Sequence, residues 1–283
     1  MKNLYRLLTA ASIIVLTTLL VACSSPKDIK PTTADTHNET AVVAPRFNAP
    51  SLVMPKDTII AEPQANAYRD AYFGDLHVHT DYSFDAYAFG TVATPYDAYR
   101  YAQGEAIAHP AGFQVQLGQP LDFYAVTDHA MFLGAVKAAA NTTTEFSKEP
   151  HVQDLHNINT PDNLNLASLP QRVKAFSTFL PDTLNRIASG DTDVAIVNKI
   201  AKDAWADIVQ AAQANNRPGE FTTFVAYEYT SSTDGRGNLH RNVIFRDSDK
   251  LPALPFSRFH SQNPEGLWDW MDGLRAQGIE TLA

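Results

Sequence analysis

From residue 71 onward, short apolar segments that end in polar clusters alternate with helical stretches. The segments Ala71–Val78 and Leu121–Thr127 have the length and the aliphatic and aromatic content of strands. Between them, Pro95 occupies a favourable first-turn position of a helix that extends to Gln103. Polar residues follow the carboxyl end of each strand. This alternation predicts an α/β domain, which we place at residues 67–283.

Two further strands are predicted at Phe221–Tyr229 and Leu239–Arg246, and Glu280–Ala283 has the pattern of a fifth strand at its beginning. The long segment 131–219 separates the second strand from the third. Residues 138–170 within it are polar and show no clear periodicity, but apolar residues later recur at helical spacing, at Val194, Val197, Ile200, Ala201, Ala204, Trp205, Ile208 and Ala212. We therefore expect a mostly helical insertion, in which substrate specificity would reside.

The amino-terminal segment has the layout of a bacterial lipoprotein signal. Lys2 and Arg6 precede the apolar run Leu7–Leu20, which is shorter than the ~20 residues of a membrane-spanning helix. The run ends at Leu20-Val21-Ala22-Cys23, and this is the only cysteine of the chain. The pattern predicts a signal peptide at residues 1–22 and lipidation of Cys23. The mature protein would then lie in the cell envelope, at the outer membrane or the periplasmic face.

Residues 23–66 form a predicted lipid-anchored flexible tether, because prolines recur there without a sustained apolar period. The chain carries 22 Lys and Arg residues against 31 Asp and Glu residues, with a formal net charge of -9. It has no basic run, which disfavours binding to nucleic acid or to an anionic bilayer. Hydrophobic residues make up 45% of the chain, which is enough for a sizeable core. Nothing in the sequence indicates an oligomeric state.

Candidate metal ligands lie at or near the strand ends. His77 and His79 alternate along the first strand, so both rings would point to one side and hold one ion together. Asp85 follows in a loop, where it is either a ligand or a solvated turn residue. His129 comes directly after the second strand, and Asp128 beside it is either a helix cap or a carboxylate that orients a ligand imidazole.

Glu228 lies in a strand that is apolar on both faces, where an unpaired carboxylate is unfavourable unless a cation neutralises it. His240, near the start of the next strand, is either a further ligand or a satisfied polar residue beside a turn. A barrel would gather these side chains on one rim, where active sites form. Together they predict a metal centre. Mixed nitrogen and oxygen ligands favour zinc or manganese, with iron as a further option, over calcium.

The motif residues resemble those of a known family. Gly74-Asp75-Leu76-His77-Val78-His79-Thr80, followed by Ser83, Asp85 and Val126-Thr127-Asp128-His129, resembles the two opening motifs of the PHP (polymerase and histidinol phosphatase) superfamily, and Glu228 and His240 follow in its ligand order. Residues 70–283 as a whole resemble a PHP-like family of unknown function found in secreted and lipid-anchored bacterial proteins.

This resemblance implies a distorted β/α barrel, of which the chain holds the N-terminal part only. It also implies two or three divalent ions and hydrolysis of a small phosphorylated substrate, a phosphate mono- or diester, by a metal-bound hydroxide. The implied ligands are His77, His79, Asp85, His129, Glu228 and His240. Arg241 or Arg236 would contact the phosphate, unless they form surface salt bridges. Strand alternation turns Arg241 away from the side that His240 faces, whereas Asn242 shares that side.

The superfamily uses further ligands, a histidine and an Asp-x-His pair, at positions that would follow Glu280. We therefore expect this chain to be a fragment of a longer gene. His260 is a poor substitute, and His109, His151 and His156 are expected at the surface. Two alternatives stay open. One is an amidohydrolase, which also begins with His-x-His, and the other is a surface lipoprotein that binds metal or another ligand without turnover.

Overall fold

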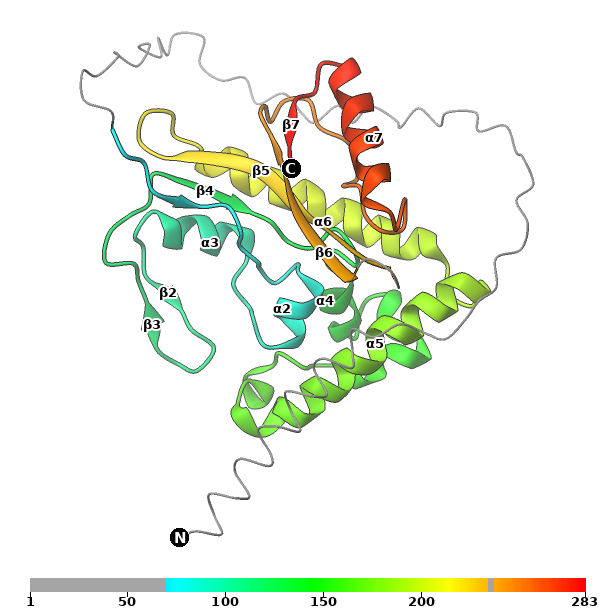
Figure 1. Cartoon of the computed structure of the whole chain (residues 1–283). Coiled ribbons are helices and arrows are strands. Elements are labelled where there is room, and N and C mark those ends of the chain that lie inside the picture. Colours follow the sequence, from blue (N-terminus) through cyan, green and yellow to red (C-terminus); the bar gives the residue numbers. More distant parts are fainter. Residues whose placement is uncertain (1–69, 234–236) are drawn as a thin grey trace, which may run out of the picture.

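The computed structural model describes residues 70–233 and 237–283, and a five-stranded mixed sheet forms their centre (Figure 1). Across the sheet the strands lie in the order β1 (Gly74–Asp75), β4 (Phe123–Val126), β5 (Thr222–Thr233), β6 (Gly237–Phe245) and β7 (Thr281–Leu282). The first three are mutually parallel, whereas β6 and β7 pair antiparallel with their neighbours. A separate hairpin pairs β2 (Ile107–Ala108) with β3 (Gln114–Val115).

The α/β class agrees with the sequence prediction, but no barrel closure is detected among the described residues, and the sheet has two edges, β1 and β7. The prediction of repeated β/α units did not anticipate that β6 runs antiparallel to β5. Residues 234–236 alone separate these strands in the sequence. A parallel partner would need a crossover of a dozen or more residues, so a connection this short joins antiparallel strands.

The first strand is much shorter than the predicted Ala71–Val78, because the chain leaves the sheet after Asp75. Side chains then replace the strand ladder as hydrogen-bonding partners. The His77 amide donates to the Asp75 Oδ1 at 3.0 Å, and the Val78 amide donates to the Thr127 Oγ1 at 2.8 Å. The histidine motif therefore lies in a loop that remains attached to β4.

One face of the sheet packs on α3 (Pro95–Ala102), α6 (Val194–Asn215) and α7 (Pro264–Ala276). Successive side chains of a strand point to opposite faces, so Val225, Tyr227 and Tyr229 of β5 all enter this core. Trp205 of α6 packs edge-on against Tyr227, with ring centroids 5.8 Å apart. The same alternation turns Glu228 to the other face, which carries the candidate site.

Residues 131–219 fold into helices with a second apolar core. The segment contains α4 (Ala135–Ala140), the 3-10 helices η1 (Phe146–Lys148), η2 (Pro150–Leu155), η3 (Pro161–Asn163) and η4 (Leu166–Ser168), then α5 (Leu169–Ser189) and α6. The polar stretch 138–170, which had no clear period, mostly forms short 3-10 turns. Figure 1 shows α5 lying away from the sheet, with these turns around it. Its core includes Phe132, Phe146, Leu155, Ile158 and Phe179.

His151 belongs to this second core and does not lie at the surface as predicted, because only 7% of its side chain is exposed. Its Nε2 lies 3.0 Å from the Thr183 Oγ1. Burial, and next the charge of Arg186, lower the pKa of His151. The folded chain therefore favours the neutral ring, so this contribution to stability is present above the unfolded pKa of about 6.5 and is lost as the pH falls below it.

We expect the urea midpoint of unfolding to fall less between pH 7.5 and pH 5.5 in the His151→Gln variant than in the unmodified chain. Glutamine keeps a hydrogen-bonding group near Thr183 but does not titrate. Replacement of the exposed His109 by glutamine serves as the control and should leave the pH dependence unchanged. An equal fall of the midpoint in all three chains would show that His151 does not carry this pH dependence.

Candidate metal centre

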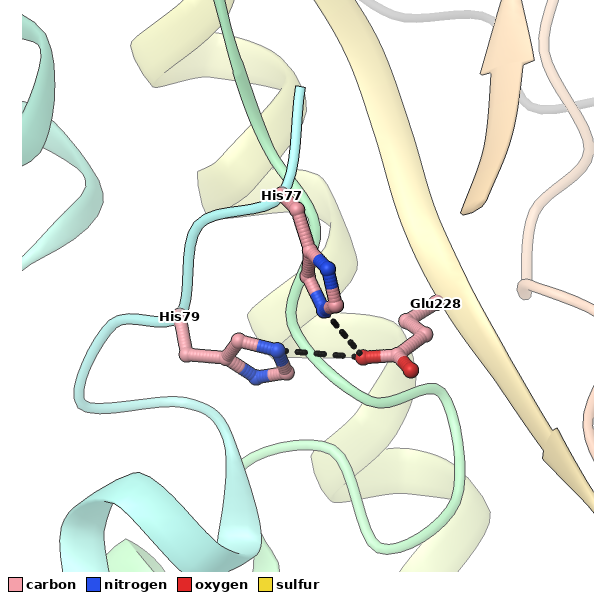
Figure 2. A group of neighbouring side chains, drawn as sticks. All are labelled: His77, His79 and Glu228. Atoms are coloured by element: carbon pink, nitrogen blue, oxygen red, sulfur yellow. Dashed lines mark hydrogen bonds and ion pairs between the residues drawn. The ribbon is translucent and has the colours of Figure 1, made fainter. Parts of the chain in front are cut away.

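His77 and His79 lie in the loop after β1, and both rings point toward Glu228 of β5 (Figure 2). Their Nε2 atoms lie 3.3 Å and 3.0 Å from the Glu228 Oε2. The loop reaches this position because Asn242 of β6 donates from its Nδ2 to the Leu76 carbonyl at 2.8 Å. The two histidines therefore share a side, as predicted, although they lie in a loop and not in a strand.

Glu228 lies at the middle of the cluster, where 1% of its side chain is exposed. Its backbone is paired on the β4 side, where its amide donates to the Asp128 carbonyl and its own carbonyl accepts from the Ala130 amide. Burial by itself raises the pKa of Glu228, but hydrogen bonds with His240 and His79 and the charges of His129 and His240 outweigh it, and the pKa is lowered well below its usual range. Glu228 is therefore a buried carboxylate anion.

Asp85 and His129 approach Glu228 from the side of α2 (Phe84–Ala88). The His129 Nε2 lies 3.3 Å from the Asp85 Oδ2, and the Nδ1 of the same ring lies 3.3 Å from the Glu228 Oε2. Burial alone would raise the pKa of Asp85, but its hydrogen bond and charge interaction with His129, together with the Ser83 hydroxyl, lower it overall. A second carboxylate anion thus lies beside the first.

His240 completes the arrangement from β6. It pairs with Thr230 across the ladder and contacts the Glu228 Oε1 through its Nδ1. The structure thereby brings all six predicted ligands together in three overlapping groups, each with ligand atoms within 4.8 Å of one another: His77, His79 and Glu228; His79, Asp85 and His129; His129, Glu228 and His240. Three residues occur in two groups each, so any ions held here would be close neighbours.

Residues 66–283 contain every member of this cluster. They match the model of a family described as a protein of unknown function, DUF3604. The chain belongs to the DUF3604 family. No curated protein and no solved structure matches it significantly. Membership of a family of unknown function agrees with the sequence analysis, whereas its placement in the PHP superfamily stays a prediction.

In this DUF3604 domain, Asp128 does not orient a ligand imidazole. Both carboxylate oxygens are occupied by Thr80, one by its amide and the other by its hydroxyl, each at 2.5 Å. Complete burial, opposed by these two hydrogen bonds, raises the pKa of Asp128 to about 7. Asp128 thus connects the histidine loop to the end of β4, and the predicted catalytic role needs this correction.

Arg241 is on the wrong face of the sheet for a catalytic role. It pairs with Tyr229, and directly opposed residues of an antiparallel pair point to the same face. Tyr229 enters the core opposite Glu228, so the Arg241 side chain leaves the sheet away from the metal cluster. Although Arg241 is next to His240 in the sequence, neighbouring residues of a strand point to opposite faces of the sheet. Arg236 lies outside the described residues.

Three residues that were not predicted as ligands or catalytic residues support the ligands. The Thr230 Oγ1 lies 2.6 Å from the His129 Nδ1, Asn242 holds the histidine loop, and the Ser83 Oγ lies 2.7 Å from the His79 Nδ1. Strand alternation points to Thr230, since it follows Glu228 by two residues. The same alternation points to Asn242, two residues after His240, and Ser83 stands in the motif that resembles the PHP superfamily.

The predicted signal peptide 1–22, the lipidation site Cys23 and the tether 23–66 all lie outside the described residues. Within residues 70–233 and 237–283, no helix is both long enough and apolar enough to cross a membrane.

Proposed function

We propose that this DUF3604 protein is a metal-dependent hydrolase of phosphate mono- or diesters, with a PHP-like centre formed by the six ligands. The observation that supports it is their convergence from segments spread over much of the domain into three overlapping groups. The resemblance of the histidine motifs to the PHP superfamily adds the reaction class. The proposed lipid anchor at Cys23 would place the activity at the cell envelope, with a small phosphorylated substrate.

The donor set fits divalent transition metals. Glu228 and Asp85 are both anionic, and every ion pair recorded for Glu228 within the described part of the chain is with a histidine. Buried carboxylate charge needs a compensating positive charge, which bound divalent cations would supply alongside the histidines. Histidine nitrogens combined with carboxylate oxygens favour zinc, manganese or iron over calcium.

The protein residues then have distinct tasks. Glu228 presents its Oε2 to His77 and His79 and its Oε1 to His240, so it is placed to be shared between ions. Bound divalent ions would activate water and neutralise the charge of the phosphoryl group. Without them, the carboxylates Glu228 and Asp85 would repel a phosphate anion. Metal is therefore required for substrate binding as well as for hydrolysis.

The proposal is tested by elemental analysis of the purified full-length chain, together with hydrolysis of p-nitrophenyl phosphate and bis(p-nitrophenyl) phosphate. We expect bound zinc, manganese or iron, and turnover that a chelator removes and the metal restores. The His79→Ala variant should lose at least about 100-fold in metal affinity, since even residues that only support ligands contribute ~10- to 100-fold. The exposed His109 supplies the matched control, His109→Ala, which should retain both metal and turnover.

Each other outcome has a definite meaning. Metal without turnover on either ester would favour a binding protein that is not an enzyme. Metal with hydrolysis of cyclic amides but not of phosphate esters would favour an amidohydrolase. A chain that binds none of the three metals would overturn the proposed centre.

A further inference from the structure

Ser83 begins helix α2 but does not act as its cap. Serine is favoured at this position because its hydroxyl usually accepts a hydrogen bond from an amide of the first turn, which stabilises the helix. In this structure the Ser83 side chain makes no capping hydrogen bond, although its backbone has the extended conformation of a cap residue. The residue is fully buried. A buried hydroxyl that is not used for capping requires other partners.

Those partners are two candidate metal ligands. The Ser83 Oγ lies 2.7 Å from the His79 Nδ1 and 2.6 Å from the Asp85 Oδ1. A serine hydroxyl has one hydrogen to donate, and an ionised carboxylate can only accept. The hydroxyl must therefore donate to Asp85 and accept from the His79 Nδ1–H.

This assignment determines which atom of each ligand faces the cluster. With its Nδ1–H donating to Ser83, the His79 ring turns its Nε2 to the cluster, 3.0 Å from the Glu228 Oε2. In the metal-free chain this nitrogen donates to the carboxylate, and a bound metal ion would take the place of that proton. The Asp85 Oδ1 accepts from the Ser83 hydroxyl and also from the Ala86 amide at 2.7 Å. Its Oδ2 faces the His129 Nε2 at 3.3 Å. Both of these atoms are thus directed into the cluster.

We propose that Ser83 is a positioning residue whose single hydroxyl selects the metal-facing atoms of His79 and Asp85 together. The inference deepens the proposed function and rests on it for its effect on metal binding. Supporting hydrogen bonds of this kind fix the tautomer and the orientation of a ligand histidine in metal sites. Ser83 itself contributes no metal ligand in this arrangement.

The first measurement is whether the His79 Nδ1 carries a proton in the metal-free full-length chain, from the ring ¹⁵N chemical shifts of ¹⁵N-histidine-labelled protein, with the His79→Ala variant used for assignment. We expect a protonated Nδ1 in the unmodified chain and a larger share of unprotonated Nδ1 in the Ser83→Ala variant. An unprotonated Nδ1 in the unmodified chain would overturn the proposal, whatever the variants do.

The second measurement is zinc affinity by competition with a chelator. Ser83→Ala should weaken zinc binding by roughly 10- to 100-fold, and Ser83→Thr, which keeps the hydroxyl, should stay within a few-fold of the unmodified chain. The matched control is Ser177→Ala, which removes an exposed hydroxyl bonded only to the Val173 carbonyl. Equal zinc affinity in the Ser83→Ala variant and the unmodified chain would overturn the role of Ser83 while leaving the metal centre intact.

The two proposals fail separately. An unmodified chain that binds no zinc would overturn the proposed function, whereas the proton on the His79 Nδ1 is read without metal and still decides the role of Ser83. An urea titration of each variant shows whether a change in affinity comes from loss of the fold. We expect Ser83→Thr, which keeps the hydroxyl, to keep both the zinc affinity and the Nδ1 proton of His79. A loss of side-chain volume at this site would not by itself change the protonation of the ring.

Discussion

We expect Glu228→Gln to lower the affinity of the chain for zinc by more than about 100-fold and to remove the proposed phosphoesterase turnover. Glu228 contacts four histidines, through its Oε2 with His77, His79 and His129 and through its Oε1 with His240. It is the residue shared by the ligand group that contains His77 and the group that contains His240. Glutamine has nearly the same shape but offers one neutral oxygen in place of two charged ones. The remaining histidines then have no shared anion through which neighbouring ions can be held.

The change is measured by chelator competition and by hydrolysis of p-nitrophenyl phosphate. Glu220→Gln, the same chemical change at a carboxylate that is 76% exposed, is the matched control and should retain full affinity. Circular dichroism of both variants should match the unmodified chain. Zinc affinity that survives in the Glu228→Gln variant would show that the buried carboxylate is not a ligand.

Arg172→Met destabilises the folded chain by about 3–5 kcal/mol, because it leaves several buried acceptors without a donor. The Arg172 guanidinium, in α5, donates to the backbone carbonyls of Ala88, Ile158 and Asn163 and to the side-chain oxygens of Ser168 and Asn159. Methionine preserves much of the side-chain volume but supplies no donor. Each orphaned buried acceptor contributes about 1–3 kcal/mol to the loss.

Urea unfolding at pH 7.5 measures this effect. Arg246→Met serves as the control, because the Arg246 side chain is 66% exposed and pairs with the exposed carboxylate of Asp247, so a change within about 0.5 kcal/mol is expected. Since the Ala88 carbonyl ends the helix that carries Asp85, zinc affinity should fall as well. An Arg172→Met chain as stable as the control would mean that water replaces the lost donors.

Much of the secondary structure could be read from local patterns. The apolar period over 194–212 predicted the helix that the structure has at Val194–Asn215, and the apolar run 121–127 contains β4. The strand that was predicted at Ala71–Val78 shortened to Gly74–Asp75, because the side chains of Asp75 and Thr127 take up the amides that a ladder would have used. Side-chain bonds to distant segments leave no periodic signal.

The candidate ligands were accessible from the sequence because their chemistry is local. A histidine pair two residues apart, a histidine directly after an apolar strand and a glutamate within one each stand out from their neighbours. The role of Asp128 was not accessible in this way, because Asp128 bonds Thr80, 48 residues away in the chain. The orientation of Arg241 was accessible, since strand alternation turns it from the side that His240 faces, and its register with Tyr229 agrees.

The sequence by itself determined the α/β class, the helical character of residues 194–212 and the identity of the six residues that form the cluster. Periodicity and residue chemistry are properties of short segments, so a single amino-acid sequence contains them. Only the tertiary structure decided that Asp128 bonds Thr80 across 48 residues of chain and that Thr230 meets His129 across 101. These contacts depend on how distant segments pack, which the local pattern of residues does not encode.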